Sequence, residues 1–251
     1  MPKVDLDKVK QEAAAITGVF QALLPSLLDG RTEIQTMKAA EELSEINTQW
    51  RQTEWIGWWF EFFVASDMVR NVIKAQQGPA YGHTRFDIQK DYVWDLKVHV
   101  ANKTGDIILN DCEAIDACHE DRGGVGFIIV FGIADFDTGG EFKAWHDALK
   151  QADAGGPSDY VMAGQAIGRR SRPRKVSFRP TMIQTLFLHD PSPEADTKGA
   201  NGILGYFQKG MVNSDGSARR AKYKIRSRSK ALEKRWLLSM KAQWPEDPLE
   251  L

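Results

Sequence analysis

The sequence predicts a mixed α/β fold, in which a mixed sheet is flanked by helices, the α+β form of this class. Residues 84–100 read as two short strands joined by a tight turn, because aromatic and β-branched residues dominate them. Residues 111–122 read as a helix behind an Asn or Asp cap. Residues 126–132 are continuously apolar, which predicts a strand buried on both faces. Strands, helix and buried strand in this order are typical of an α/β core.

Helical segments precede this core. Residues 3–29 carry apolar side chains near helical spacing, and Pro25 is expected to kink or end that helix. Residues 32–77 read as a second helical region, broken once at most. Its stretch 50–64 is apolar on almost every side and should be buried. Glu61 lies inside that stretch, so its carboxylate needs a partner, a proton or a metal.

The rest of the chain is expected to alternate short elements with loops. Residues 141–151 have the apolar stripe of a short helix, and residues 182–188 read as a strand. Residues 189–216 have a loop-like composition. Residues 230–244 read as a final helix that Pro245 stops.

The composition is that of a soluble globular protein, with 42% hydrophobic and 27% charged residues in a chain of 251. No apolar run is long enough to span a bilayer, and residues 1–5 lack the apolar core of a signal peptide. Cys112 and Cys118, with His119 alone beside them, are too few for a zinc site or a disulfide framework. We therefore expect a cytoplasmic protein without a membrane partner.

Basic residues are concentrated in the last third of the chain. Residues 169–241 hold 18 Lys and Arg against 5 Asp and Glu, although the net charge of the whole chain is −1. This asymmetry favours a polyanionic partner, most simply nucleic acid, over a merely solvated basic surface. The candidate DNA-binding residues are Arg169, Arg170, Arg172, Arg174, Lys175, Arg179, Gln184, Arg219, Arg220, Lys222, Tyr223, Lys224, Arg226 and Arg228.

A small set of charged residues lies within the predicted strand pair. Side chains alternate faces along a strand, so Asp95 and Lys97 should point the same way, and Asp87 can reach that face across the hairpin. Two carboxylates and one ammonium would then meet at a strand end, which suits a divalent metal beside an anionic substrate. Asp91 lies in the turn, where Asp is common for backbone reasons, so it is left out of the site.

Asp87 followed by Asp95-Leu96-Lys97 resembles the PD-(D/E)xK motif of the restriction-endonuclease-like nucleases, with Phe86 in place of the proline. Gly57-x-x-x-Glu61 resembles the acidic helix that commonly precedes the motif in that superfamily. The resemblance implies a single restriction-endonuclease-like domain over 1–251. Its three parts would be a helical part (1–77), a catalytic core (78–151) and a basic DNA-binding part (152–251).

The resemblance also implies Mg²⁺ as cofactor. Asp87 and Asp95 would be metal ligands, with the main-chain carbonyl of Leu96 as a third. Lys97 would lie beside the attacking water, and Glu61 would be an accessory ligand or would hold a metal-bound water. Two alternatives remain for the helix: Glu61 pairs with Arg51 or Arg70, or Glu54 supplies the carboxylate.

The expected function is that of a type II restriction endonuclease, a Mg²⁺-dependent and sequence-specific nuclease of double-stranded DNA. Such enzymes usually act as two-fold homodimers on palindromes, so a homodimer is expected. The chain has no G-x-x-x-x-G-K-[ST] loop, so no nucleotide cofactor is expected. The alternatives are a Holliday-junction resolvase or repair nuclease of the same fold, and a non-catalytic DNA-binding protein in which Asp95 and Lys97 form an exposed ion pair.

Overall fold

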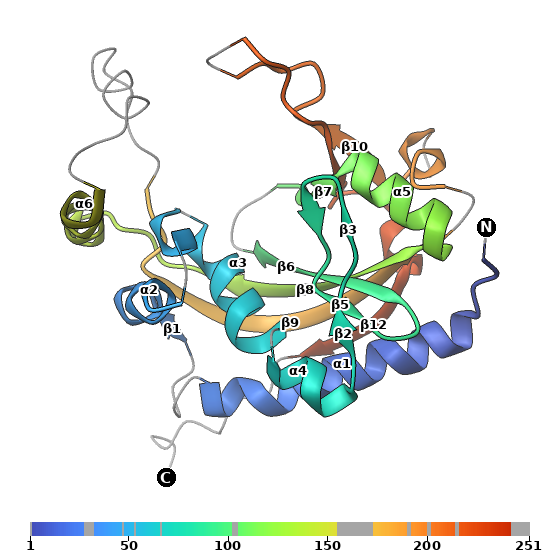
Figure 1. Ribbon diagram of the computed structural model, residues 1–251, viewed down its shortest axis with the longest axis horizontal. Coiled ribbons are helices and arrows are strands. Elements are labelled where there is room, and N and C mark those ends of the chain that lie inside the picture. The colour runs from blue at the N-terminus through green and yellow to red at the C-terminus, as the bar shows by residue number, and fades with distance from the viewer. Residues whose placement is uncertain are drawn as a thin grey trace.

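The computed structural model describes residues 2–27, 33–46, 48–52, 54–65, 67–101, 105–154, 173–189, 192–199, 202–213 and 216–241. Within these residues the fold is mixed α/β: a curled, mixed sheet lies at the centre and helices flank it (Figure 1). The predicted mixed α/β class, with a mixed sheet flanked by helices, is therefore confirmed.

The main sheet has seven strands, and its central pair is parallel. The strand order is β1 (Ile34–Gln35), β9 (Ser177–Leu188), β8 (Val125–Ile133), β6 (Val93–Val100), β5 (Ile88–Gln89) and β2 (Gln76–Gln77), and β12 (Trp236–Lys241) also pairs with β9. β6 and β8 run parallel, whereas the pairs β8–β9 and β5–β6 are antiparallel. β6 therefore lies in the interior of the sheet, between β8 and the short strand β5.

A second sheet and a short ribbon lie beside the main sheet. The second sheet contains β10 (Leu204–Phe207), β11 (Lys222–Ile225) and β7 (Ile107–Asp111), all antiparallel. The ribbon pairs β3 (Ala80–Tyr81) with β4 (Thr84–Arg85). The first of the two strands predicted within residues 84–100 thus appears as two short strands, β4 and β5. Phe86 lies between them, and its side chain is fully buried.

The helices divide between the two faces of the main sheet. They are α1 (Leu6–Leu27), α2 (Thr36–Ser44), α3 (Trp55–Phe60), α4 (Asp67–Ile73), α5 (Cys112–Arg122) and α6 (Glu141–Ala154). Residues of α1, α2 and α3 share one apolar core with Trp94 and Leu96 of β6. Residues of α5 and the second sheet share the other core with Val93 of β6 and Phe127 of β8. The main sheet is therefore covered on both faces, as Figure 1 shows.

Two helical predictions need correction. The region 32–77 is broken several times, because a 3₁₀ turn (Thr48–Arg51) separates α2 from α3 and a π-helical turn (Glu61–Ala65) follows α3. The predicted final helix 230–244 is wrong: residues 236–241 form β12, which pairs with β9. The helix α1 is confirmed, and it continues through Pro25 to Leu27. None of the helices that the structure describes combines the length and apolar character that a bilayer crossing requires.

Glu12 of α1 fixes the turn that leads into β6, and the sequence gives no sign of this role. Its side chain is 6% exposed. One carboxylate oxygen accepts hydrogen bonds from Trp94 Nε1 at 2.9 Å and from the main-chain N–H of Tyr92 at 3.2 Å. The other oxygen accepts from the main-chain N–H of Asp91 at 3.1 Å. Three otherwise unpaired donors are thereby satisfied by one buried carboxylate.

Glu12→Ala should lower the free energy of unfolding by about 2–4 kcal/mol, because it leaves the buried Nε1 of Trp94 and two half-buried main-chain N–H groups of the turn without an acceptor. Urea denaturation followed by tryptophan fluorescence measures the change. Lys10→Ala, an exposed position on the same helix, is the matched control and should change stability by less than about 0.5 kcal/mol. Equal effects of the two substitutions would contradict the role of Glu12.

Candidate active site

The predicted site residues meet beside β6, next to the part of its edge that β5 leaves unpaired. The short strand β5 pairs only with Val93 and Trp94 of β6. Beyond these two residues, a side chain replaces the neighbouring strand. Oδ2 of Asp87 accepts a hydrogen bond from the main-chain N–H of Leu96 at 2.7 Å. In a strand the N–H and C=O of one residue point to the same edge, so the carbonyl of Leu96 faces the side of β6 where Asp87 lies.

Asp95 is held from two sides in the interior. Asp95 is only 2% exposed. Oδ1 accepts a hydrogen bond from Asn110 Nδ2 at 3.0 Å, and Oδ2 forms an ion pair with Lys97 Nζ. Asp95 and Lys97 therefore lie on one face of β6, as the alternation of side chains requires. The ion pair is not the exposed one considered above, since the side chain of Lys97 is 23% exposed and that of Asp95 is 3% exposed.

A cavity of about 470 Å³ opens at this cluster. Glu61, Asp87, Asp95, Lys97 and Asn110 are among the residues that line it. The helix carboxylate at the cluster is thus Glu61. Glu54 does not line this cavity, and its carboxylate is bound to Lys175 at 2.6 Å.

The carboxylates perturb one another. Burial, and then the charge of Asp95, raise the pKa of Glu61 to about 7, although Lys97 acts in the opposite direction. Burial, followed by the charges of Asp95 and Glu61, raises the pKa of Asp87 well above its usual range. Burial alone would lower the pKa of Lys97, but the three surrounding carboxylates outweigh it and raise that pKa. The cluster therefore holds more negative charge than one ammonium can neutralise.

These residues fit a hard divalent cation. Crowded carboxylates whose pKa values are raised are relieved when a cation binds between them. Within the described part of the chain, no three His, Cys, Asp or Glu side chains already converge as a preformed metal cage. Mg²⁺ does not need such a cage, because it keeps several waters and is commonly bound through one or two carboxylates. Asp87, Asp95 and the Leu96 carbonyl would supply the protein oxygens.

Asn110 was not among the predicted site residues. It comes from β7 and is 8% exposed. In the sequence it stands at the end of an apolar run and directly before a predicted helix, so it reads as a helix cap. A polar residue at the end of a buried strand was the signal that could have pointed to the site.

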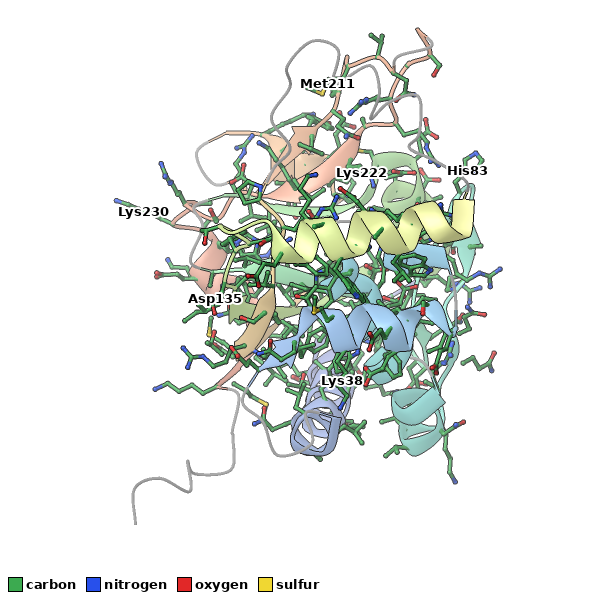
Figure 2. The ribbon with its side chains drawn as sticks, turned by 90° about the vertical axis from the view of Figure 1, so that its left-hand side faces the viewer. Lys38, His83, Asp135, Met211, Lys222 and Lys230 are labelled. Atoms are coloured by element: carbon green, nitrogen blue, oxygen red, sulfur yellow. The ribbon has the colours of Figure 1, made fainter. Side chains whose placement is uncertain are left out.

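Arg85 of β4 and Lys222 of β11 are among the basic residues at the cavity. Lys222 lines it, and Asp111 pairs with both Arg220 at 3.1 Å and Lys222 at 3.8 Å. In Figure 2, Lys222 and His83 lie on one side of α6, and Lys38 of α2 lies on the other. His83 also lines the cavity.

Tyr223 needs correction as a DNA-binding residue. Its side chain is 1% exposed, and its hydroxyl donates to Asp116 at 3.1 Å. A ring in this position cannot stack on a base. Its neighbours on β11 point to the other face of that strand, which keeps Lys222 and Lys224 outside the core.

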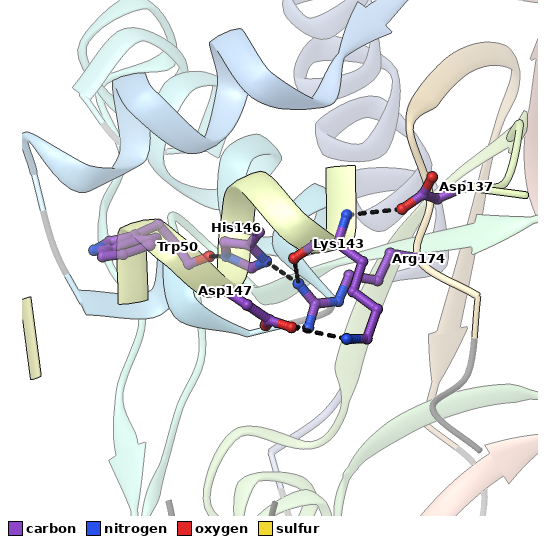
Figure 3. A network of polar contacts seen from close by, with 6 residues as sticks. All are labelled: Trp50, Asp137, Lys143, His146, Asp147 and Arg174. Atoms are coloured by element: carbon purple, nitrogen blue, oxygen red, sulfur yellow. Dashed lines mark hydrogen bonds and ion pairs between the residues drawn. The ribbon is translucent and has the colours of Figure 1, made fainter. Parts of the chain in front are cut away.

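Other predicted DNA contacts already have partners inside the protein. Arg174 Nη2 donates to Asp147 at 2.6 Å and its Nη1 lies 3.1 Å from His146 Nδ1 (Figure 3). Lys224 pairs with Asp106 at 2.8 Å, and Arg226 donates to the carbonyl of Thr197 at 3.2 Å. Gln184 Nε2 donates to Ser239 Oγ at 3.1 Å. The remaining candidates Arg179, Arg219 and Arg228 are exposed, and Arg169, Arg170 and Arg172 lie outside the described residues.

Comparison of the chain with models of protein families, with curated proteins and with solved structures finds no match. The chemistry of the site therefore has to be inferred from its own residues.

The carboxylate cluster predicts a pH-dependent stability in the absence of metal. The unfolded chain ionises Glu61 near pH 4.5 and the folded chain near pH 7. Between these values the folded state binds more protons, so the free energy of unfolding falls as the pH rises. In EDTA, Glu61→Gln should match the wild type near pH 4 and exceed its stability by about 3 kcal/mol at about pH 8.

Chemical denaturation at the two pH values measures this difference, and Glu54→Gln is the control because the Glu54 side chain is 73% exposed. A Glu61→Gln protein with the wild-type pH dependence would show that Glu61 is not part of the charged cluster. Millimolar Mg²⁺ should raise the melting temperature of the wild type above pH 7, and Asp87→Asn should reduce that rise.

Proposed function

We propose that the protein is a Mg²⁺-dependent endonuclease of double-stranded DNA with a PD-(D/E)xK site, acting as a type II restriction enzyme. One observation carries the proposal: Asp87, Asp95 and Lys97 meet at one edge of a central strand, and Glu61 joins them from the preceding helical region. These are the four positions that the motif resemblance assigns. A structural ion pair would need neither the extra carboxylates nor the open cavity.

The residues divide the work of phosphodiester hydrolysis among them. When bound, Mg²⁺ lowers the pKa of a water and offsets charge on the phosphate. Lys97 stays an ammonium, because its neighbours raise its pKa, and it can donate to the attacking water or to a phosphate oxygen. Glu61, with a pKa of about 7, can exchange a proton with water near neutral pH. A water oxygen bonds to phosphorus as the bond to the leaving sugar oxygen breaks, and that oxygen takes up a proton.

Asn110 and Asp87 have positioning roles in this proposal. The amide of Asn110 fixes Oδ1 of Asp95, which leaves Oδ2 toward Lys97. Asp87 bonds the Leu96 N–H and so fixes the edge of β6 at the centre of the motif. Two orienting hydrogen bonds of this kind hold a site in one geometry before substrate binds.

DNA would approach from the side of β11. Lys222 lines the cavity, and Arg220 shares with it the partner Asp111. The side chains of Arg220 and Lys222 are 54% and 39% exposed, so their remaining N–H groups can donate to phosphate oxygens while both stay paired with Asp111. A two-fold homodimer would place two such sites on the two strands of a palindrome.

Asp95→Asn and Lys97→Ala should each reduce DNA cleavage at least about a thousandfold, because they remove the charges that act on the phosphate. The assay is digestion of supercoiled plasmid DNA with Mg²⁺, followed by sequencing of the ends. Discrete fragments are expected from the wild type, and cleavage confined to four-way junctions would instead assign a resolvase.

Asp91→Asn is the matched control, since Asp91 is an exposed carboxylate in the turn before β6. It should cleave at the wild-type rate. An Asp95→Asn protein that cuts as fast as the wild type would show that the chemistry takes place elsewhere.

A further inference from the structure

A second hollow adjoins the proposed active site. It has a volume of about 270 Å³ and lies between α3 and the second half of β6. Trp58, Glu61 and Lys97 line both this hollow and the cavity that holds Asp95. The two spaces therefore meet at the carboxylate cluster, and a polymer bound at Lys97 can continue into the second one.

Both charged and apolar side chains line the hollow. Lys97 lies at the end near the active site, and Lys175 lines it together with Glu54. Apolar side chains line the hollow as well: Ile56, Trp58, Leu96, Val98 and Val100. Gly57 leaves its wall open, because a Cβ built there meets nothing within 4 Å.

A polar network fixes the segment that carries Lys175 (Figure 3). The carbonyl of Trp50 can only accept, so His146 Nε2 donates to it at 2.9 Å. His146 Nδ1 then accepts from Arg174 Nη1 at 3.1 Å. Burial lowers the pKa of His146 to about 4, so the ring is neutral at neutral pH and its Nδ1 can accept. Arg174 directly precedes Lys175, and the carbonyl of Lys175 accepts from Thr36 Oγ1 at 2.9 Å.

The ammonium of Lys175 is fixed less firmly than its backbone. Its partner is the carboxylate of Glu54 at 2.6 Å. The Glu54 side chain is 73% exposed, whereas that of Lys175 is 16% exposed. A solvated carboxylate is easily replaced by another anion. Lys175 is thus a positioned cation whose present partner can be displaced by a phosphate.

We propose that this hollow is a subsite for one nucleotide of the cleaved strand, the one next to the scissile phosphate. Its base lies unpaired against Trp58, and its distal phosphate binds Lys175. The inference rests on the proposed nuclease function. Two lysines and several apolar side chains line this one hollow, and a nucleotide with its flanking phosphates presents the matching groups, two anions joined by a sugar and base.

The test uses single-stranded tetrathymidylate with a fluorescent label, titrated in EDTA at several salt concentrations and followed by anisotropy. Trp58→Leu should weaken binding about tenfold without changing the salt dependence, because stacking involves no counterions. Lys175→Gln should reduce the slope of log K against log salt by about 0.7, the value for one phosphate contact on a single strand. Trp236→Leu and Lys230→Gln, at positions that line neither space, are the matched controls and should bind like the wild type.

Gly57→Leu guards against a folding artefact. It improves the helix propensity of α3 and puts a side chain into the hollow, so it should weaken binding while the melting temperature is kept or raised. Wild-type affinity in Gly57→Leu, Trp58→Leu and Lys175→Gln, or no binding by the wild type, overturns the subsite.

Plasmid cleavage by the wild type, measured in parallel, separates the two proposals. Tetrathymidylate that binds as described without any Mg²⁺-dependent cleavage would overturn the nuclease function and keep the nucleotide subsite. Cleavage by the wild type together with unchanged binding in the three variants would support the nuclease function and overturn the nucleotide subsite.

Discussion

The arrangement depends on one buried charge, the carboxylate of Asp95 in the central strand β6. A carboxylate that is removed from water must be paired and hydrogen-bonded. Asn110 and Lys97 meet this need, one from the second sheet and one from β6 itself. Asp87 and Glu61 bring two further carboxylates close to Asp95. Burial, and then the charges of the neighbouring carboxylates, raise the pKa values of Asp87 and Glu61. Such groups, perturbed in a cleft, are typical of functional sites rather than of structural ion pairs.

The fold brings these groups together through features that are each unfavourable alone. β5 stops early, which leaves the edge of β6 to a side chain instead of a strand. A π-helical turn begins at Glu61, directly after α3. Turns of this kind are frequent at functional sites, because they redirect side chains at a cost in helix stability. The buried carboxylate of Glu12 holds the turn that starts β6.

The sequence was sufficient wherever local periodicity decided the outcome. The apolar stripe of α1, the apolar run of β8 and the alternation in β6 all depend on a few neighbouring residues, and the structure has these elements at those places. Gly123, with φ at 80°, ends α5 in the left-handed conformation that glycine favours. The grouping of Asp87, Asp95 and Lys97 followed from the same local rules.

Contacts between residues that are distant in the sequence decided the features that the sequence did not predict. The apolar residues of 236–241 fit the pattern of a helix, but in the structure they form strand β12, which pairs with β9. Tyr223 stands in a basic run, yet the alternation of β11 turns it into the core. The ion pair of Lys224 with Asp106 and the hydrogen bond from Asn110 to Asp95 each join two different strands or loops. Residue types and local spacing therefore could not predict them.

Anomalous diffraction from a crystal grown with Mn²⁺, a stand-in for Mg²⁺, tests most directly whether this cluster is a metal centre. A Mn²⁺ peak is expected within coordination distance of the carboxylates of Asp87 and Asp95 and of the Leu96 carbonyl, with waters completing the shell. It should be absent from crystals of the Asp95→Asn protein. A wild-type crystal whose Mn²⁺ lies only at surface carboxylates, with Asp95 still paired to Lys97 alone, would contradict the assignment.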